Sequence, residues 1–282
     1  MIKYMFSLIP FFSSATTLSG MEYKETLRHH FLSFYQFLAD TRVIPEAFFK
    51  ESEESQLCLL GLDNCYFNMV MGYSTEESHW DDYIEEQVTL FKKAKLPFVW
   101  YVDEEGSPQF KEKLIQHGFK EAGVFRGVAG TLDPSFSLSP IPSDSTLELV
   151  TDAAAMDEWA DLVCSIFAIE NVKETYKKMM WDLAIQGKAY HWLARKEGKV
   201  VSAVSTLIEG SMVSFWNGAS LPAIRRQGYS TALRRLALRH ALTRGCQIGA
   251  SYLMSEGLAF GICRSLGYET KWQFDVFVWD QK

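Results

Sequence analysis

The chain has 282 residues, of which 48% are hydrophobic and 22% charged, the composition of a globular protein with one large or two medium domains. Its formal net charge of -7 excludes the basic excess that a general binder of nucleic acid or acidic membrane presents on its contact face. We therefore expect no nucleic-acid partner and no membrane partner, and the pattern predicts no spanning helix.

Five cysteines are scattered along the chain: Cys58, Cys65, Cys164, Cys246 and Cys263. Their number is odd, and none lies in a C-x-x-C or Cys/His pattern of the kind that a zinc site needs. We therefore expect no metal, and a reducing compartment, the cytoplasm, is the simplest interpretation.

The first twenty residues are predicted to be a leader. A short apolar run from Met5 to Phe12 superficially resembles a secretory signal, but Pro10 interrupts it. A helix-like pattern opens at Met21, where a chain would naturally start. This favours a disordered leader or a mis-set start codon over a cleaved signal peptide.

The sequence divides near its middle. Residues 133–146, D-P-S-F-S-L-S-P-I-P-S-D-S-T, contain three prolines and five serines, which is the composition of a linker. We predict a first domain at 21–135, a linker at 136–145 and a second domain at 146–282.

The two halves follow the same order of elements at an offset of 149 residues. The helix-like run 230–244 falls on 81–95, the strand-like run 246–251 falls on 97–102, and Gly267 falls on Gly118. Agreement without a gap over some 60 residues predicts a duplicated fold, although sequence identity in this register is low.

The second half shows its predicted elements most clearly. Apolar spacing and turn residues predict a strand, two helices, a hairpin turning at Glu197 and Gly198, a strand, a helix, a strand, a helix and a final hairpin, at residues 146–150, 153–166, 172–186, 189–208, 212–219, 230–244, 246–254, 257–266 and 268–279. Antiparallel hairpins followed by strand, helix and strand indicate a mixed sheet in an α/β fold.

One short stretch between a strand and a helix has the chemistry of an anion site. Residues 225–230 read R-R-Q-G-Y-S. Backbone N–H groups at a helix start attract phosphate, Gly228 permits close approach, Ser230 is small and can cap, and the two arginines add charged donors. The stretch is neither a Walker loop nor a dinucleotide fingerprint.

The stretch resembles a signature of the GNAT N-acetyltransferase superfamily, Arg/Gln-x-x-Gly-x-Gly/Ala, and residues 255–268 are similar to the family segment that ends in Tyr-x-x-Leu-Gly-Phe. The resemblance covers residues 147–279 and is weaker in the first half. It implies two GNAT-like domains, each a mixed, mostly antiparallel sheet flanked by helices, with a degenerate first copy. It also implies an acetyl-CoA site at Gly218, Ala219, Ser220, Arg225, Arg226, Gln227, Gly228, Tyr229 and Ser230.

The first copy lacks this chemistry. In the 149-residue register R-R-Q-G-Y-S falls on E-E-S-H-W-D, residues 76–81, so carboxylates replace both arginines and His79 replaces the glycine. Like charge would repel a pyrophosphate there. We predict that the first copy does not bind CoA at this place.

Acid and base are harder to assign. By the resemblance, the tyrosine that usually protonates the departing thiolate is replaced by Cys263, and the usual strand glutamate is missing, so Glu209 in the preceding turn is the nearest base. A buried structural thiol and a solvated turn glutamate are the plain alternatives. His191 is a further candidate, and Tyr229 and Tyr252 are alternative donors for which packing is the plain alternative. Glu170 is instead a candidate contact for a cationic substrate.

A basic run on the predicted helix 230–244 is interpreted as a solvated face that complements the helix dipole: Arg234, Arg235, Arg239, His240 and Arg244. Trp192 and Trp216 are the aromatic residues proposed to line an acceptor pocket.

Two functions remain open. The first is an N-acetyltransferase that acts on an amine-bearing small molecule, peptide or protein, in which the first domain shapes the acceptor pocket or the fold. The second is a non-catalytic protein that binds acyl-CoA or a partner. The sequence does not select the acceptor.

Overall fold

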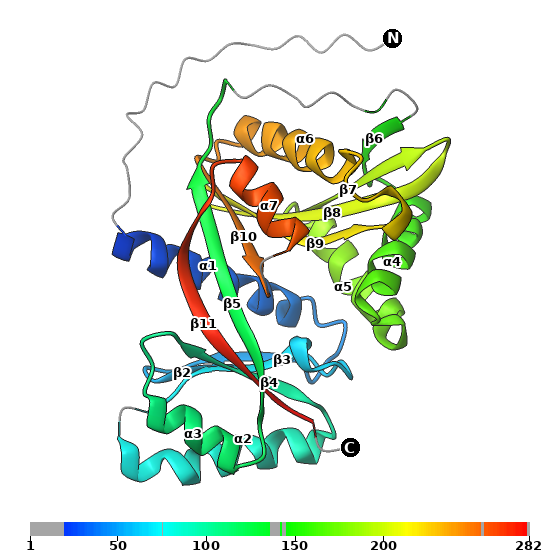
Figure 1. Cartoon of the computed structure of the whole chain (residues 1–282). Helices are drawn as coiled ribbons and strands as arrows, with labels where there is room; N and C mark the ends of the chain where they lie inside the picture. Colours follow the sequence, from blue (N-terminus) through cyan, green and yellow to red (C-terminus); the bar gives the residue numbers. More distant parts are fainter. Residues whose placement is uncertain (1–19, 75, 136–141, 143–144, 255–256, 281–282) are drawn as a thin grey trace.

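The computed structural model describes residues 20–74, 76–135, 142, 145–254 and 257–280 (Figure 1). The expected leader, apart from Gly20, and most of the expected linker lie outside these residues. The first half contains α1 Gly20–Asp40, β1 Phe48–Glu51, β2 Ser55–Leu59, β3 Asn68–Gly72, α2 Trp80–Ala94, β4 Phe98–Asp103, α3 Pro108–Gln116 and β5 Lys120–Thr131.

The second half repeats this plan with one further helix and one further strand: β6 Ser145–Leu149, α4 Ala153–Phe167, α5 Lys173–Ile185, β7 Ala189–Lys196, β8 Lys199–Glu209, β9 Met212–Ser220, α6 Tyr229–Thr243, β10 Ile248–Leu253, α7 Leu258–Ser265 and β11 Glu269–Trp279. The predicted turn at Glu197 and Gly198 is confirmed, and both residues have the positive φ that a two-residue hairpin turn requires. The predicted final hairpin is wrong, because residues 269–279 form one strand.

The duplication is visible in the elements themselves. α2 and α6 have 15 residues each and begin at Trp80 and Tyr229, which are 149 positions apart. β5 and β11 begin at Lys120 and Glu269, at the same offset. The register predicted from the sequence is therefore the register of the fold, which is α/β with a mixed, mostly antiparallel sheet between helices.

The strands form one sheet of eleven in the order β1-β2-β3-β4-β11-β5-β10-β9-β8-β7-β6. The last strand of each half is exchanged and pairs with a strand of the other half: β5 pairs antiparallel with β10, and β11 pairs antiparallel with β4. The two exchanged strands also pair with each other and run side by side through the middle of the molecule (Figure 1). The halves are therefore joined through their strands.

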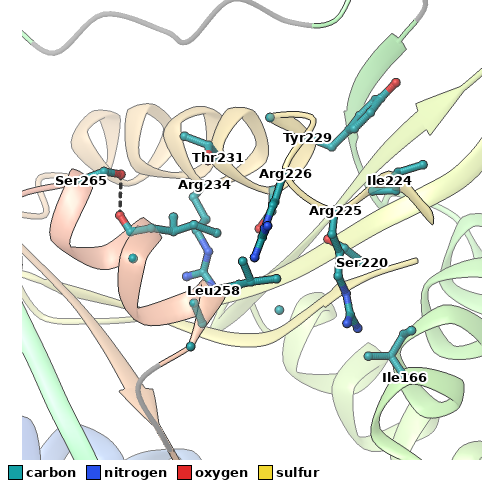
Figure 2. Close-up of a pocket in the computed structure, with 17 residues that line it drawn as sticks. Ile166, Ser220, Ile224, Arg225, Arg226, Tyr229, Thr231, Arg234, Leu258 and Ser265 are labelled. Carbon is teal, nitrogen blue, oxygen red and sulfur yellow. Dashed lines mark hydrogen bonds between the residues drawn. The ribbon is translucent and has the colours of Figure 1, made fainter. Parts of the chain in front are cut away.

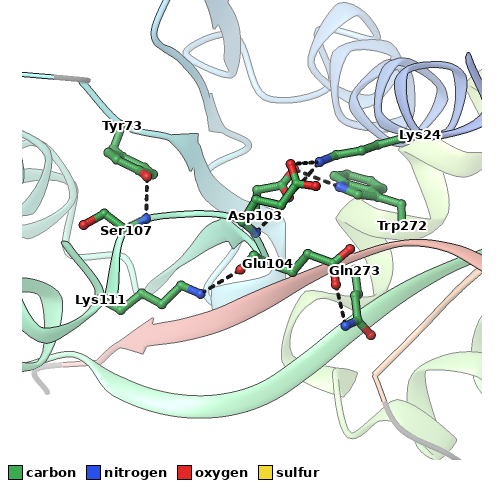
Figure 3. A network of polar contacts seen from close by, with 9 residues as sticks. Lys24, Tyr73, Asp103, Glu104, Ser107, Lys111, Trp272 and Gln273 are labelled. Atoms are coloured by element: carbon green, nitrogen blue, oxygen red, sulfur yellow. Dashed lines mark hydrogen bonds and ion pairs between the residues drawn. The ribbon is translucent and has the colours of Figure 1, made fainter. Parts of the chain in front are cut away.

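Polar contacts fasten β11 to the first half (Figure 3). The Trp272 indole N–H donates to Asp103 at 3.1 Å, and the Gln273 side chain donates to Glu104 at 2.6 Å. Lys24 of α1 donates to Asp103 at 3.0 Å. One helix, one loop and the exchanged strand thus meet around Asp103.

Helices cover both faces of the sheet. α1, α4 and α5 share one apolar core on one face, whereas α6 and α7 pack on the opposite face of the second half and α2 and α3 on that of the first half. The Phe31 ring of α1 lies over the crossing strands, with ring centroids 5.8 Å from Trp216 and 5.9 Å from Trp272. Through α1, the first half reaches the part of the second half where its strands separate.

Candidate functional site

The separation of two parallel strands creates the site. β9 and β10 pair from Met212 with Ile248 as far as Phe215 with Ser251, and beyond these residues β9 continues to Ser220 without β10. Asn217, at φ 53°, lies in an irregularity of the β8–β9 register. The backbone of residues 216–220 therefore presents a strand edge that β10 does not fill.

A cleft of about 820 Å³ opens beside this edge, between β9, α6 and α7 (Figure 2). Of the nine residues predicted to bind acetyl-CoA, seven line it: Gly218, Ser220, Arg225, Arg226, Gly228, Tyr229 and Ser230. Ala219 is buried, and Gln227 turns back to bond the Ala223 carbonyl at 3.0 Å. The structure thus brings most of the predicted set to one cavity.

The start of α6 has the features of an anion site. Gly228 caps the helix at φ 90° without a side-chain hydrogen bond, and the first turn holds no acidic residue. The first N–H groups of a helix have no intrahelical acceptor and carry the positive end of its dipole. Arg226 has φ 66°, a strained value for a residue other than glycine that is typical of ligand-binding loops.

Three arginines converge on this cleft. Figure 2 shows Arg226 and Arg234 extending from α6 and the loop before it toward Leu258, and Arg225 extending toward Ile166 of α4, while the ring of Tyr229 points away from them. Among the described residues that line the cleft, no aspartate or glutamate opposes these charges. The cavity is therefore suited to an anion with several negative charges.

A second cleft of about 690 Å³ adjoins the first on the side of α1. Its walls are mainly aromatic and come from both halves: Phe34, Tyr35, Tyr66, Phe67, Tyr101 and Phe125 from the first, and Phe167, Tyr176, Phe215, Trp216 and Tyr252 from the second. The Phe34 and Trp216 rings stack at a centroid distance of 3.9 Å. The expectation that Trp216 lines a pocket is confirmed, whereas Trp192 packs in the core beneath α6.

A chain of hydrogen bonds supports the wall of the second cleft. Tyr176 donates to the Asn217 side chain at 2.9 Å, Asn217 reaches Ser205 at 3.5 Å, and Ser205 lies 2.8 Å from Nδ1 of His191. Nε2 of His191 lies 3.0 Å from the Met180 carbonyl, which only accepts, so Nε2 carries the proton and Nδ1 accepts from Ser205. This chain holds Asn217 in place beside the strand edge.

The candidate base His191 lies outside both clefts. It is fully buried, and burial lowers its pKa to about 4, so the imidazole is neutral at neutral pH. Glu209 also lies elsewhere: its carboxylate is 3.7 Å from Nε2 of His29, beside the β8–β9 turn. Neither residue is among those that line the clefts.

Cys263 lies behind the cleft wall. It is fully buried, and burial raises the pKa of its thiol, opposed by the charge of Arg234 and a hydrogen bond with Ser251. Its neighbours Gly261, Ile262 and Ser265 face the first cleft instead. As placed here, the thiol does not reach the cavity in which a departing thiolate would leave.

The interpretation of the basic run as a solvated face is wrong for Arg234. The residue is only 4% exposed, and its Nε and Nη1 are buried without a hydrogen-bond partner. Its guanidinium lies 4.6 Å from the centroid of the Phe215 ring and lines both clefts. Its sequence position carried a signal, because Arg234 shares a helix face with the buried Ala237 and Ala241.

The described residues contain no group of histidine, cysteine, aspartate and glutamate side chains that could hold a metal ion. No described helix has the length and apolarity needed to cross a membrane.

Residues 143–250 match the family model described as an acetyltransferase (GNAT) domain. No curated protein matches the chain in sequence. Solved structures with similar folds include a GCN5-related N-acetyltransferase from Kribbella flavida, with a TM-score of 0.67, 14% identity and coverage of 92% of this chain and 97% of that chain.

Two further similar structures share the whole arrangement. A GCN5-related N-acetyltransferase from Sphaerobacter thermophilus has a TM-score of 0.64 and 14% identity, and covers 93% of each chain. A tandem GNAT protein from the clavulanic acid biosynthesis pathway has a TM-score of 0.56 and 12% identity, and covers 93% of this chain and 96% of that chain. At such identities the likeness concerns the fold, including its duplication.

Proposed function

We propose that this chain, whose residues 143–250 are a GNAT acetyltransferase domain within a tandem GNAT fold, transfers an acetyl group from acetyl-CoA to a primary amine. One observation carries the proposal. An unpaired strand edge, a helix start without acidic residues and two arginines, Arg225 and Arg226, face the same cleft. The second half of the chain is therefore the active one.

Successive parts of acetyl-CoA, from the pyrophosphate to the thioester, match successive parts of the cleft. Its pyrophosphate would bind the N–H groups at the start of α6 together with Arg225 and Arg226. Its pantetheine arm carries amide groups that pair with a free strand edge, and Gly218 to Ser220 offer one. The thioester would then lie near Gly218, which lines both clefts.

The reaction that fits is direct transfer. The amine nitrogen bonds to the thioester carbon, the carbonyl oxygen gains negative charge, and the carbon–sulfur bond breaks to release the CoA thiolate, while the amine loses a proton. The attacking amine must be neutral. Because no described aspartate or glutamate lines the clefts, we assign the removal of its proton to water.

The first half contributes to the acceptor side. Phe34 and Tyr35 of α1, with Tyr101 of β4 and Phe125 of the exchanged strand β5, supply walls of the second cleft. At its own helix start Asp81 is paired with Lys113 and His117, at 2.7 and 2.8 Å. We propose that this half shapes the acceptor cleft and binds no CoA.

A non-catalytic acyl-CoA-binding protein is the second candidate, favoured by the burial of Cys263 behind the cleft wall. Both candidates bind acetyl-CoA, so turnover separates them. Release of CoA, followed with a panel of amines and peptides, supports the enzyme, whereas tight binding without release or hydrolysis supports the second candidate. We also propose a reducing compartment, consistent with the five cysteines being free.

A further inference from the structure

Arg234 is a buried cation to which no described residue provides an anionic partner. Its Nε and Nη1 are buried and unpartnered, and no ion pair joins it to another described residue. A buried charge without a partner is expensive to maintain, because the interior solvates it far less well than water does. Burial accordingly lowers the pKa of Arg234 from its usual value. None of the described residues supplies the opposing negative charge, and a bound anion would.

The position of Arg234 in the fold indicates where its anion would bind. It lies a turn and a half into α6, beyond the helix start where Arg225 and Arg226 face the first cleft. It also lines the second cleft, among whose described residues it is the only charged one. Arg234 therefore lies where the two clefts meet, deeper along α6 than the helix start that the pyrophosphate would occupy.

The second cleft provides an apolar surface next to Arg234, which suits a ligand with an apolar group beside its negative charge. Its aromatic walls are extended by three exposed apolar side chains at its lining, Tyr66, Phe167 and Leu258. Exposed apolar groups that gather at one cavity mark a ligand surface. A cation with no described acidic neighbour also repels a polyamine or another polycationic acceptor and favours the neutral form of an amine.

From these contacts we infer that the acceptor is an α-amino acid with an apolar or aromatic side chain, whose carboxylate binds Arg234. The side chain occupies the second cleft, and the amine, two bonds from the carboxylate, lies beside the strand edge at Gly218. Nη2 of Arg234 lies at Gly218 and is not among its buried, unpartnered nitrogens. A charge-assisted hydrogen bond from Nη2 to the carboxylate would orient the amine. This inference rests on the proposed function and narrows its acceptor.

The test is a calorimetric titration of the protein saturated with CoA, which cannot react. The probes are phenylalanine and leucine, each compared with its own amide, which keeps the side chain and the amine but lacks the carboxylate. We expect at least one acid to bind about tenfold or more tighter than its amide, because the amide leaves the buried cation unpaired. Arg234→Gln should abolish this preference, and Arg234→Lys should restore part of it.

Arg239→Gln is the matched control, since Arg239 lies on the same helix and is exposed. Circular dichroism and acetyl-CoA affinity, measured on every variant, separate misfolding from loss of the carboxylate site. Equal affinity for acids and amides, or no binding of any probe, in a protein that binds acetyl-CoA overturns the inference alone. Failure to bind acetyl-CoA at all overturns the proposed function instead.

A second titration distinguishes the source of the carboxylate. Acetyl-CoA and succinyl-CoA differ by a carboxylate on the acyl group. Because Arg234 is assigned to the acceptor, we expect Arg234→Gln to leave the affinity for both acyl donors nearly unchanged. A loss confined to succinyl-CoA would assign Arg234 to the acyl donor, and an equally large loss for acetyl-CoA would assign it to CoA; either result overturns the acceptor assignment.

Discussion

The guanidinium of Arg234 lies so close to Gly218 that a Cβ atom on this glycine would be 2.7 Å from Nη2. The missing side chain therefore leaves room for the cation at the strand edge. We predict that Gly218→Ala displaces Arg234 and lowers kcat/KM for the preferred amine by about tenfold, since misplacement of a charged contact by 1 Å is costly. Steady-state kinetics measure the effect.

A double-mutant cycle shows whether this effect passes through Arg234. Combined with Arg234→Gln, the alanine at 218 should cause little further loss, because the displaced group is already gone. Additive losses would show that Gly218 acts on its own, for example by admitting the pantetheine arm.

The two copies provide a matched pair of variants for CoA binding. Arg226→Gln should weaken acetyl-CoA binding by about tenfold, with less dependence on salt, because a charged hydrogen bond to phosphate is lost. Glu77 occupies the same place in the first copy and is exposed. Glu77→Gln should leave the acetyl-CoA affinity unchanged in the same titration; a comparable loss would place a CoA site in the first half.

The burial of Cys263 predicts a thiol that is slow to react and takes no part in catalysis. Cys263→Ala should change kcat by less than about threefold and leave its pH profile unaltered, because the thiol does not line the cleft. In the folded protein, iodoacetamide should modify the thiol slowly, since burial raises its pKa and the thiolate is the reactive form. A fall in kcat by a hundredfold would restore Cys263 as the acid.

His191 predicts a loss of stability in acid. Its folded pKa is about 4, below the ordinary value of 6.5, so its stabilising effect is fully present above pH 6.5 and is lost as the pH falls through 4. Its full size is about 3 kcal/mol. Urea unfolding at pH 7, 5.5 and 4.5 should show this slope, and a variant such as His191→Gln should show a flatter one; parallel slopes would contradict the assignment.

The exchanged strands predict that the halves depend on each other. A fragment of residues 146–282 lacks β5 and leaves the edge of β10 open, so it should aggregate or show no cooperative unfolding. Co-expression with residues 21–135 should restore a soluble complex in size-exclusion chromatography. A fragment 146–282 that unfolds cooperatively by itself would contradict this prediction.

The sequence predicted what depends on local pattern and spacing. The repeat, most of the second-half elements and the helix start at Gly228 could be predicted, because apolar periodicity and glycine positions are local properties. The exchange of β5 and β11 was not, because a strand pattern indicates which residues face the core but not which neighbour a strand pairs with. For the same reason β11 was predicted as a hairpin.

The site shows a similar division. All residues of the motif 225–230 except Gln227 line the cleft, whereas Glu209 and Cys263, which were assigned by their position relative to a motif, do not. Arg234 was taken for part of a solvated basic run, although it shares a helix face with alanines. The second cleft depends on contacts between the halves, such as Tyr252 donating to the Leu27 carbonyl at 2.8 Å, that no local pattern reveals.

The distance along the chain between β4 and β11 has a consequence for synthesis. β4 emerges from the ribosome long before the strand that lies beside it in the sheet. At about 5 to 20 residues per second, the first half waits on the order of ten seconds with an incomplete sheet. We expect this nascent chain to benefit from a chaperone that shields unpaired strands until β11 has been translated.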